Sequence, residues 1–346
     1  MNMETVQTVT GPAAFDQLGV ILPHEHLFND LTARIDDPAY GFSQSLTQAT
    51  VSPENVWALR QDPYCCADNL RDKPVTDVVR ELNAFAKIGG GTIVDATGSA
   101  GIGRNPWRLL EAAQKTGLNV IMSTAPYLEV FEAAGADLSA DEIAQRIDDD
   151  LNIGVDDTGI KAGLIGEVGV SPEFTDQERR ALRGAALAQT NNPHAALNIH
   201  MPGWQRRGDQ VLKIVIDEAG VDPAKVSLAH SDPSGHDVDY QRRLLNRGVW
   251  LEFDMIGLDV TFPHEGVSPT VNQTAHAVAG LIEAGFDGQL LLSHDLFLKQ
   301  MWSVNGGNGF SFVPTVFLEL LAAAGVNDAI VKKLVTENPA RMLTGH

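Results

Sequence analysis

Cysteine is almost absent from this chain of 346 residues. Its only two cysteines, Cys65 and Cys66, are adjacent, and neighbouring residues form a disulfide only with strain. No third or fourth soft ligand stands near them, so we expect two bystander thiols rather than a zinc site. The sequence therefore excludes a domain held together by a disulfide framework.

Targeting segments are also missing from the sequence. Residues 1–22 lack the basic start, apolar stretch and small-residue cleavage site of a secretory signal. No apolar run reaches the roughly 20 residues that a membrane-spanning helix needs. We therefore expect a cytoplasmic protein that does not contact membranes.

Basic residues are scarce. The chain has 25 Lys and Arg against 45 Asp and Glu, which gives a formal net charge of −20. Nucleic acids and anionic membranes are bound by clustered Lys and Arg, so this balance argues against both as partners. With 44% hydrophobic residues the chain can bury a large core, and we expect its partner to be a small-molecule substrate.

Short runs rich in Val, Ile and Leu alternate with longer segments of helical period. This alternation predicts a mostly parallel sheet covered by helices. We expect strands at Leu18–His24, Gly91–Ala96, Asn119–Ser123, Gly163–Val168, Ala195–His200, Lys225–His230, Trp250–Asp254 and Gln289–Ser293. We expect helices at Thr76–Lys87, Trp107–Lys115, Ala140–Leu151, Asp176–Gln189, Gln210–Ala219, Val238–Asn246, Thr270–Ala284 and Pro314–Ala324. Eight such units predict an α/β fold, a (β/α)₈ TIM barrel formed by residues 1–346 as a single domain.

One long excursion, residues 27–74, separates the first predicted strand from the first predicted helix. It carries the aromatic residues Phe28, Phe42, Trp57 and Tyr64. In a barrel this β-α loop lies on the face that holds the active site, where long loops form pockets and lids. We therefore expect it to cover the active-site face.

Histidines and acids follow the predicted strands. Because parallel strands of a barrel end on the same face, residues that are distant in sequence meet there. Four imidazoles and two carboxylates fall at or just past strand ends: His24, His26, Glu167, His200, His230 and Asp295. Taken singly, each histidine could simply cap a backbone carbonyl, but the repetition on several strands predicts a metal site.

The ligand types indicate the metal and its chemistry. Mixed nitrogen and oxygen ligands suit Zn²⁺, with Mn²⁺, Co²⁺ or Fe²⁺ as alternatives. Two divalent ions about 3.5–4 Å apart need a bridging anion, a role that we assign to Glu167. A hydroxide between the ions is then the expected nucleophile, and Asp295, both ligand and general base, would take its proton.

These residues and their surroundings resemble the phosphotriesterase family of the amidohydrolase superfamily. The motifs that carry the resemblance occur in the family's order at 18–26, 89–92, 162–169, 229–232, 293–295 and 337–343. The segment 57–64 also resembles the first loop of the phosphotriesterase-related proteins. The resemblance implies that His24, His26 and Asp295 bind the more buried ion and that His200 and His230 bind the other.

The sequence departs from the best-known members at the bridging position. They use a carboxylated lysine, whereas this chain has Glu167 within a Gly-Glu-Val-Gly run that is similar to a subgroup of relatives. Glu167 stands one position later than the lysine would. A one-residue shift in a strand changes the face to which a side chain points, so we expect a local bulge there.

Four further residues are candidates. Asp254 is similar to the acid that relays protons in the family, and a role in orienting a metal ligand is the alternative. Tyr127 matches a pocket tyrosine of lactonase-like relatives, or else packs at the rim. Arg104 and His264 are in loops of the same face, where they would bind substrate unless they are idle surface residues.

The expected activity follows from this site. We expect hydrolysis of a carboxylic ester, lactone or amide of a small molecule, with a phosphotriester as the alternative substrate. A different class of protein, one that retains the metal and binds a ligand without catalysis, is the further alternative. The resemblance also implies that the chain can form a homodimer.

Overall fold

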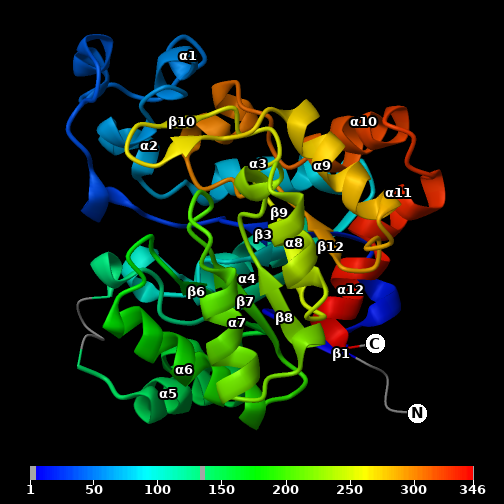
Figure 1. Cartoon of the computed structure of the whole chain (residues 1–346). Helices are drawn as coiled ribbons and strands as arrows, with labels where there is room; N and C mark the ends of the chain where they lie inside the picture. The colour runs from blue at the N-terminus through cyan, green and yellow to red at the C-terminus, as the bar shows by residue number, and fades with distance from the viewer. Residues whose placement is uncertain (1–4, 133–136, 346) are drawn as a thin grey trace.

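Eight parallel strands form one sheet in the computed structural model, which describes residues 5–132 and 137–345. The strands are β3 (Val20–Glu25), β4 (Gly90–Asp95), β5 (Asn119–Thr124), β6 (Leu164–Gly169), β7 (Ala196–His200), β8 (Val226–Leu228), β9 (Trp250–Phe253) and β12 (Leu290–Leu292). Each pairs with its sequence neighbour, and helices lie between them around a nearly closed barrel (Figure 1). The predicted TIM barrel is confirmed, and each strand begins and ends within two residues of its predicted bounds.

Helices follow the strands, as predicted. They are α3 (Val75–Lys87), α4 (Pro106–Thr116), α5 (Ala140–Asn152), α6 (Asp176–Asn191), α7 (Gly208–Leu212), α8 (Val238–Leu245), α9 (Val271–Glu283) and α10 (Leu318–Ala323). Helix α7 continues as a π-helical turn over Lys213–Glu218, and another such turn, Val313–Phe317, precedes α10. At the start of α5, the side chain of Ser139 accepts from Glu142 N while the Glu142 carboxylate accepts from Ser139 N, which satisfies two amides of the first turn.

The end of the barrel where the strands begin, opposite the predicted metal ligands, is closed by elements that the sequence pattern did not predict. These are the hairpin of β1 (Thr5–Thr8) and β2 (Gly11–Ala14) and the helices α11 (Asp328–Val335) and α12 (Glu337–Thr344). Val6 of the hairpin and Met342 of α12 pack in one buried cluster with Ile21, Val94 and Leu291 of the strands. This apolar base keeps water out of the barrel interior beneath the strand ends.

The first and last strands of the barrel are joined mainly by side chains. The Glu25 carboxylate accepts hydrogen bonds from Ser293 Oγ (2.8 Å), His294 N (3.0 Å) and Leu296 N (3.0 Å). The backbone adds one bond, from Asp295 N to the carbonyl of His24 at 3.2 Å. We call these Glu25 contacts the Glu25 clamp, and they fix the turn that follows β12 relative to β3.

The long excursion of residues 27–74 lies over the end of the barrel where the strands end (Figure 1). It contains α1 (Val56–Leu59) and α2 (Ala67–Leu70) and lies beside the short strands β10 (Thr261–Phe262) and β11 (Gly266–Val267) (Figure 1). The two segments are linked by a hydrogen bond from Thr261 N to the carbonyl of Arg60 at 2.7 Å. Among the helices of the described residues, none has the length and apolar character required to cross a bilayer.

Candidate metal centre and active site

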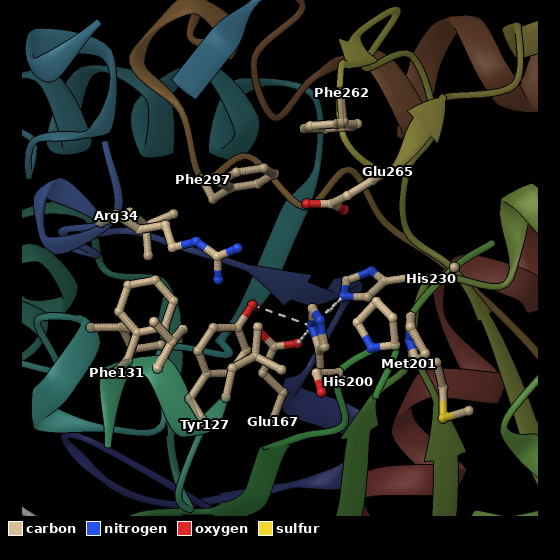
Figure 2. A pocket seen from close by; sticks show the side chains of 18 of the residues that line it. Arg34, Tyr127, Phe131, Glu167, His200, Met201, His230, Phe262, Glu265 and Phe297 are labelled. Atoms are coloured by element: carbon tan, nitrogen blue, oxygen red, sulfur yellow. Dashed lines mark hydrogen bonds and ion pairs between the residues drawn. The ribbon is translucent and has the colours of Figure 1, made fainter. Parts of the chain in front are cut away.

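The strand ends bring the six predicted metal ligands together. His24 lies in β3, Glu167 in β6 and His200 in β7, while His26, His230 and Asp295 follow β3, β8 and β12. In Figure 2, Glu167, His200 and His230 gather at the floor of a cavity. The convergence expected from strand-end placement is therefore present, although the residues span 271 positions from His24 to Asp295.

A bulge aims Glu167 into the cluster. The pairing of β6 with β7 shifts register between Ile165 and Val168, where the sequence predicted an irregularity. Gly166 has φ of +145°, and a Cβ on it would lie 2.7 Å from the carbonyl oxygen of Asn198. Only glycine fits this position without strain, and it allows the following glutamate to face the cluster.

Glu167 lies at the centre of the histidines. Its Oε1 atom lies 3.4 Å from Nε2 of His26. Its Oε2 atom lies 3.0 Å from Nδ1 of His200 and 3.5 Å from Nε2 of both His24 and His230. Each carboxylate oxygen therefore serves a different part of the cluster, which is the arrangement that a bridging ligand requires.

Three of the histidines are oriented by partners on their outer nitrogens. Nδ1 of His26 lies 2.9 Å from Thr97 Oγ1 and Nδ1 of His230 lies 2.9 Å from Asp254 Oδ1. Nδ1 of His24 lies 3.3 Å from Glu252 Oε2. Partners of this kind place the ring proton on Nδ1 and leave Nε2 to bind a metal. Glu252 was not recognised from the sequence, although an acid inside the apolar run of β9 was a signal for it.

Two ligands have an unusual backbone. His230 has φ of +57° and Asp295 has φ of +55°, values that non-glycine residues rarely adopt. Hydrogen bonds hold both, because His230 N donates to both Asp254 carboxylate oxygens at 3.0 Å and Asp295 N donates to the carbonyl of His24. Strained ligands maintained by surrounding bonds are typical of functional sites.

The cluster is a dense network of charges. Burial alone would lower the pKa of His24, but Glu167 and Asp254 outweigh it and raise the pKa to about 10. Burial is likewise outweighed at His26, where hydrogen bonds to Asp295 and Glu167 raise the pKa to about 9. Burial would raise the pKa of Glu167, yet His200 and His24 hold it well below its ordinary value.

These residues fit a divalent metal ion. Among the described residues, His24, His26 and Asp295 form one group with ligand atoms within 4.8 Å of one another, and His24, Glu167 and His230 form another. Nε2 of His24 is buried and makes no hydrogen bond, as expected of an atom reserved for a metal. The ion pairs of Glu167 and Asp295 within the described part of the chain involve only histidines, so no Lys or Arg there neutralises these acids.

A cavity of about 610 Å³ opens above the cluster. Tyr127 and His264, predicted from the sequence to bind substrate, both line it, and the Tyr127 hydroxyl lies 3.3 Å from His200 Nδ1. Several lining residues were not predicted from the sequence: Arg34, Tyr64, Phe131, Met201, Trp204, Phe262, Glu265 and Phe297. They come from loops, which carry no periodic pattern, and only the aromatic content of the long excursion indicated Tyr64.

Arg104 and Asp254 lie elsewhere. Arg104 is not among the residues that line this cavity. Its guanidinium lies 2.8 Å from Asp150 of α5 and lines an adjoining cavity of about 440 Å³, to which none of the six predicted ligands contributes. Asp254 is fully buried behind His230, a position from which it orients the ligand and does not contact substrate.

Comparison with known proteins identifies the family. A model of the phosphotriesterase family matches residues 4–343. The chain belongs to the phosphotriesterase family. It is 31% identical to the N-acetyltaurine hydrolase of Salmo salar over 98% of this chain and 97% of that protein. It is 29% identical to a phosphotriesterase-related protein of Nematostella vectensis over 99% of both chains, and the predicted resemblance is confirmed.

A solved structure of similar fold agrees with the family assignment. A crystal structure described as a resiniferatoxin-binding protein from Rhodobacter sphaeroides is 40% identical to this phosphotriesterase-family chain. The two superpose with a TM-score of 0.96, covering 99% of this chain and 95% of the other. The family model and the curated N-acetyltaurine hydrolases place the chain among the hydrolases of the family, and its cluster could hold a metal.

Proposed function

We propose that the chain is a binuclear metal-dependent hydrolase that cleaves a carboxylic ester, lactone or amide of a small molecule. The observation that carries the proposal is the position of Glu167, whose two carboxylate oxygens face different histidines. His24, His26 and Asp295 would hold one ion, and His200 and His230 the other, with Glu167 shared. When bound, such ions polarise a carbonyl and lower the pKa of water.

Asp295 is placed to handle the proton. Its Oδ1 atom lies 3.2 Å from His26 Nε2, and its Oδ2 atom lies 3.8 Å from His230 Nδ1. The carboxylate therefore reaches toward both parts of the cluster and lines the cavity where a substrate carbonyl would lie. In this position it can take a proton from the attacking water and deliver it to the leaving group. Asp254 keeps His230 oriented while this happens.

Among the candidate bonds, the amide has specific support. Relatives about 30% identical over nearly the whole chain are named N-acetyltaurine hydrolases, and the bond that such an enzyme cleaves is an amide. The cavity walls combine aromatic side chains with many polar and charged ones, which suits a small acylated compound that also carries polar groups. We therefore place N-acyl amines first, before lactones and simple esters.

The first experiment measures bound metal and turnover together. Protein from cells grown with added Zn²⁺ or Mn²⁺ is expected to carry two ions per chain by elemental analysis. The substrates are N-acetyltaurine, N-acetyl-β-alanine, neutral N-acetylethanolamine, a γ-lactone, an aryl ester and an aryl phosphotriester. We expect the best N-acyl substrate to reach kcat/KM of at least about 10⁴ M⁻¹s⁻¹.

Two results would contradict the proposal. Fewer than one ion per chain would exclude the binuclear site, and efficient turnover of the phosphotriester alone would exclude the proposed bond type. Asp295→Asn is the matched variant, because it keeps the size of the side chain and removes its proton-accepting charge. It is expected to retain metal and lose turnover, and unchanged activity would remove the role of Asp295.

A further inference from the structure

Arg34 projects into the cavity from the long excursion. It ends the short 3₁₀ helix Thr32–Arg34 and lines the cavity above the metal cluster. In Figure 2 its guanidinium points toward the middle of the cavity, between the rings of Phe297 and Tyr127 and opposite Glu265. A substrate held at Glu167 would therefore extend toward this cation.

The charge of Arg34 is unusual for its surroundings. Among the described residues that line the cavity, Arg34 is the only Lys or Arg. Seven acidic side chains line the same space: Asp36, Glu129, Glu167, Glu173, Glu178, Glu265 and Asp295. If Glu167 and Asp295 are neutralised by metal, five acids remain, and Arg34 is the only Lys or Arg among the described lining residues that can attract an anion.

The Arg34 guanidinium is also uncommitted. Within the residues that the structure describes, no hydrogen bond or ion pair joins it to another side chain, whereas Arg60, Arg104 and Arg108 each pair with an aspartate. Glu265 faces Arg34 across the cavity (Figure 2), but the two side chains do not form an ion pair. Because Arg34 is exposed, water can satisfy its donors, and a ligand that enters the cavity can replace that water.

We propose that Arg34 is the specificity-determining residue of this site and that it binds an anionic end group of the substrate, a sulfonate or a carboxylate. The inference rests on the proposed function, because it takes the Glu167 cluster as the place where the acyl bond is cleaved. The planar guanidinium offers paired N–H donors that match the oxygens of either anion. The rings of Phe297 and Phe131 line the same cavity, and Arg34 itself is exposed, so its guanidinium is accessible to a ligand that enters.

The opposite charge at Glu265 sharpens the selection. A neutral end group would gain no charge-assisted hydrogen bond from Arg34, and a group with its anion displaced from Arg34 would meet the carboxylate of Glu265. Arg34 and Glu265 together therefore require an anionic end group on the substrate, and they also determine where in the cavity that group lies. The substrate class is therefore an N-acyl compound that carries an anionic terminus.

The test compares charged and neutral substrates in variants of this pair. Arg34→Gln is expected to lower kcat/KM for N-acetyltaurine and N-acetyl-β-alanine by about 10- to 100-fold, the value of a hydrogen-bonded charge contact. Neutral N-acetylethanolamine should change by less than about threefold. Arg34→Lys, which keeps the charge but not the paired donors, should give an intermediate loss. The relative losses on the two anions show whether sulfonate or carboxylate is preferred.

Glu265→Gln supplies a change in the opposite direction. Removing this acid removes repulsion, so kcat/KM for both anionic substrates should rise by about two- to fivefold. Arg80→Gln, on the outer side of α3, is the matched control and should leave all substrates unchanged. If Arg34→Gln affects the neutral and anionic substrates equally, or if Arg34→Gln and Glu265→Gln both impair the anionic ones alike, the inference is wrong.

A binding measurement separates this inference from the proposed function. In 4-oxopentane-1-sulfonate a methylene replaces the amide nitrogen, so calorimetry can measure its affinity without turnover. If no amide is cleaved but the wild type binds this probe at least tenfold more tightly than Arg34→Gln, the proposed function fails and the role of Arg34 stands. If amides are cleaved but the two proteins bind the probe equally, the proposed function stands and the role of Arg34 is overturned.

Discussion

The floor and the mouth of the cavity are built in different ways. On the floor, His24, His26 and His230 are buried, and each has an outer partner that fixes its ring. At the mouth, Arg34 and Glu265 come from loops and face the cavity without pairing with each other. From this difference we expect the floor to fix the reaction and the mouth to select among substrates. Changes to the floor should therefore affect every substrate alike.

The largest effect is expected at Glu167. Glu167→Gln keeps the size of the side chain but removes the charge that faces all four histidines. Loss of a direct ligand should exceed the 10- to 100-fold cost of losing an outer partner, so kcat/KM should fall by more than about 100-fold for every substrate. Elemental analysis should show fewer ions per chain.

The control for this change is Glu173→Gln, which alters an acid that lines the same cavity outside the cluster. It should keep both ions. Full metal content in Glu167→Gln would show that Glu167 is not a ligand. It would contradict the proposal that the floor of the cavity holds the metal while the mouth selects substrates.

The next effect concerns the partners of the ligands. Asp254→Asn weakens the contact that orients His230, because a neutral amide replaces a carboxylate at 2.9 Å from Nδ1. Metal affinity should fall by about 10- to 100-fold, measured by competition with a chelator. Asp239→Asn, an exposed change on α8, is the control and should have no effect. Normal affinity with lower kcat would instead support the proton-relay role that the resemblance implies for Asp254.

A smaller effect is expected where the barrel closes. Glu25→Gln cannot accept all the hydrogen bonds of the Glu25 clamp and should lower the free energy of unfolding by about 1–3 kcal/mol. Urea titration of the metal-free protein measures this loss. The comparison variant Glu111→Gln, on the partly exposed face of α4, should change stability by less than about 0.5 kcal/mol. Equal stability of the two variants would show that the clamp contributes nothing measurable.

The smallest effect is expected on the outside of the long excursion. Trp57 is 68% exposed and contacts Phe42 at the surface, so Trp57→Ser should change stability by no more than about 0.5 kcal/mol. Its activity on both anionic and neutral substrates should equal that of the wild type. A change in kcat/KM for all substrates would mean that the outer part of the excursion also controls the floor.

The sequence predicted the floor far better than the mouth. Buried parallel strands are continuous apolar runs, so their ends, and with them His24, Glu167 and His230, could be located from the pattern. Arg34 and Glu265 belong to irregular segments whose path depends on tertiary contacts. Arg104 could not be placed for the same reason. The sequence around it does not show whether its guanidinium pairs with Asp150 of α5 or binds a substrate.

The sequence pattern did not predict the hairpin of β1 and β2 or helix α12, for a different reason. The hairpin of β1 and β2 consists of two four-residue strands that are too short for a clear alternation. Helix α12 follows the last strand of the barrel, so the repeating pattern of strand and helix did not require it. Both are held by the apolar base of the barrel, to which strands from β3 at one end of the sheet to β12 at the other contribute.

The Glu25 clamp also has a consequence for how the site is made in the cell. Glu25 lies near the start of the chain and its partners, Ser293 to Leu296, lie near the end. A ribosome must therefore translate the chain as far as residue 295 before Asp295 can join His24 and His26. During synthesis His24 and His26 are therefore present before Asp295 is made. A nascent chain released before residue 295 would lack one of the predicted ligands.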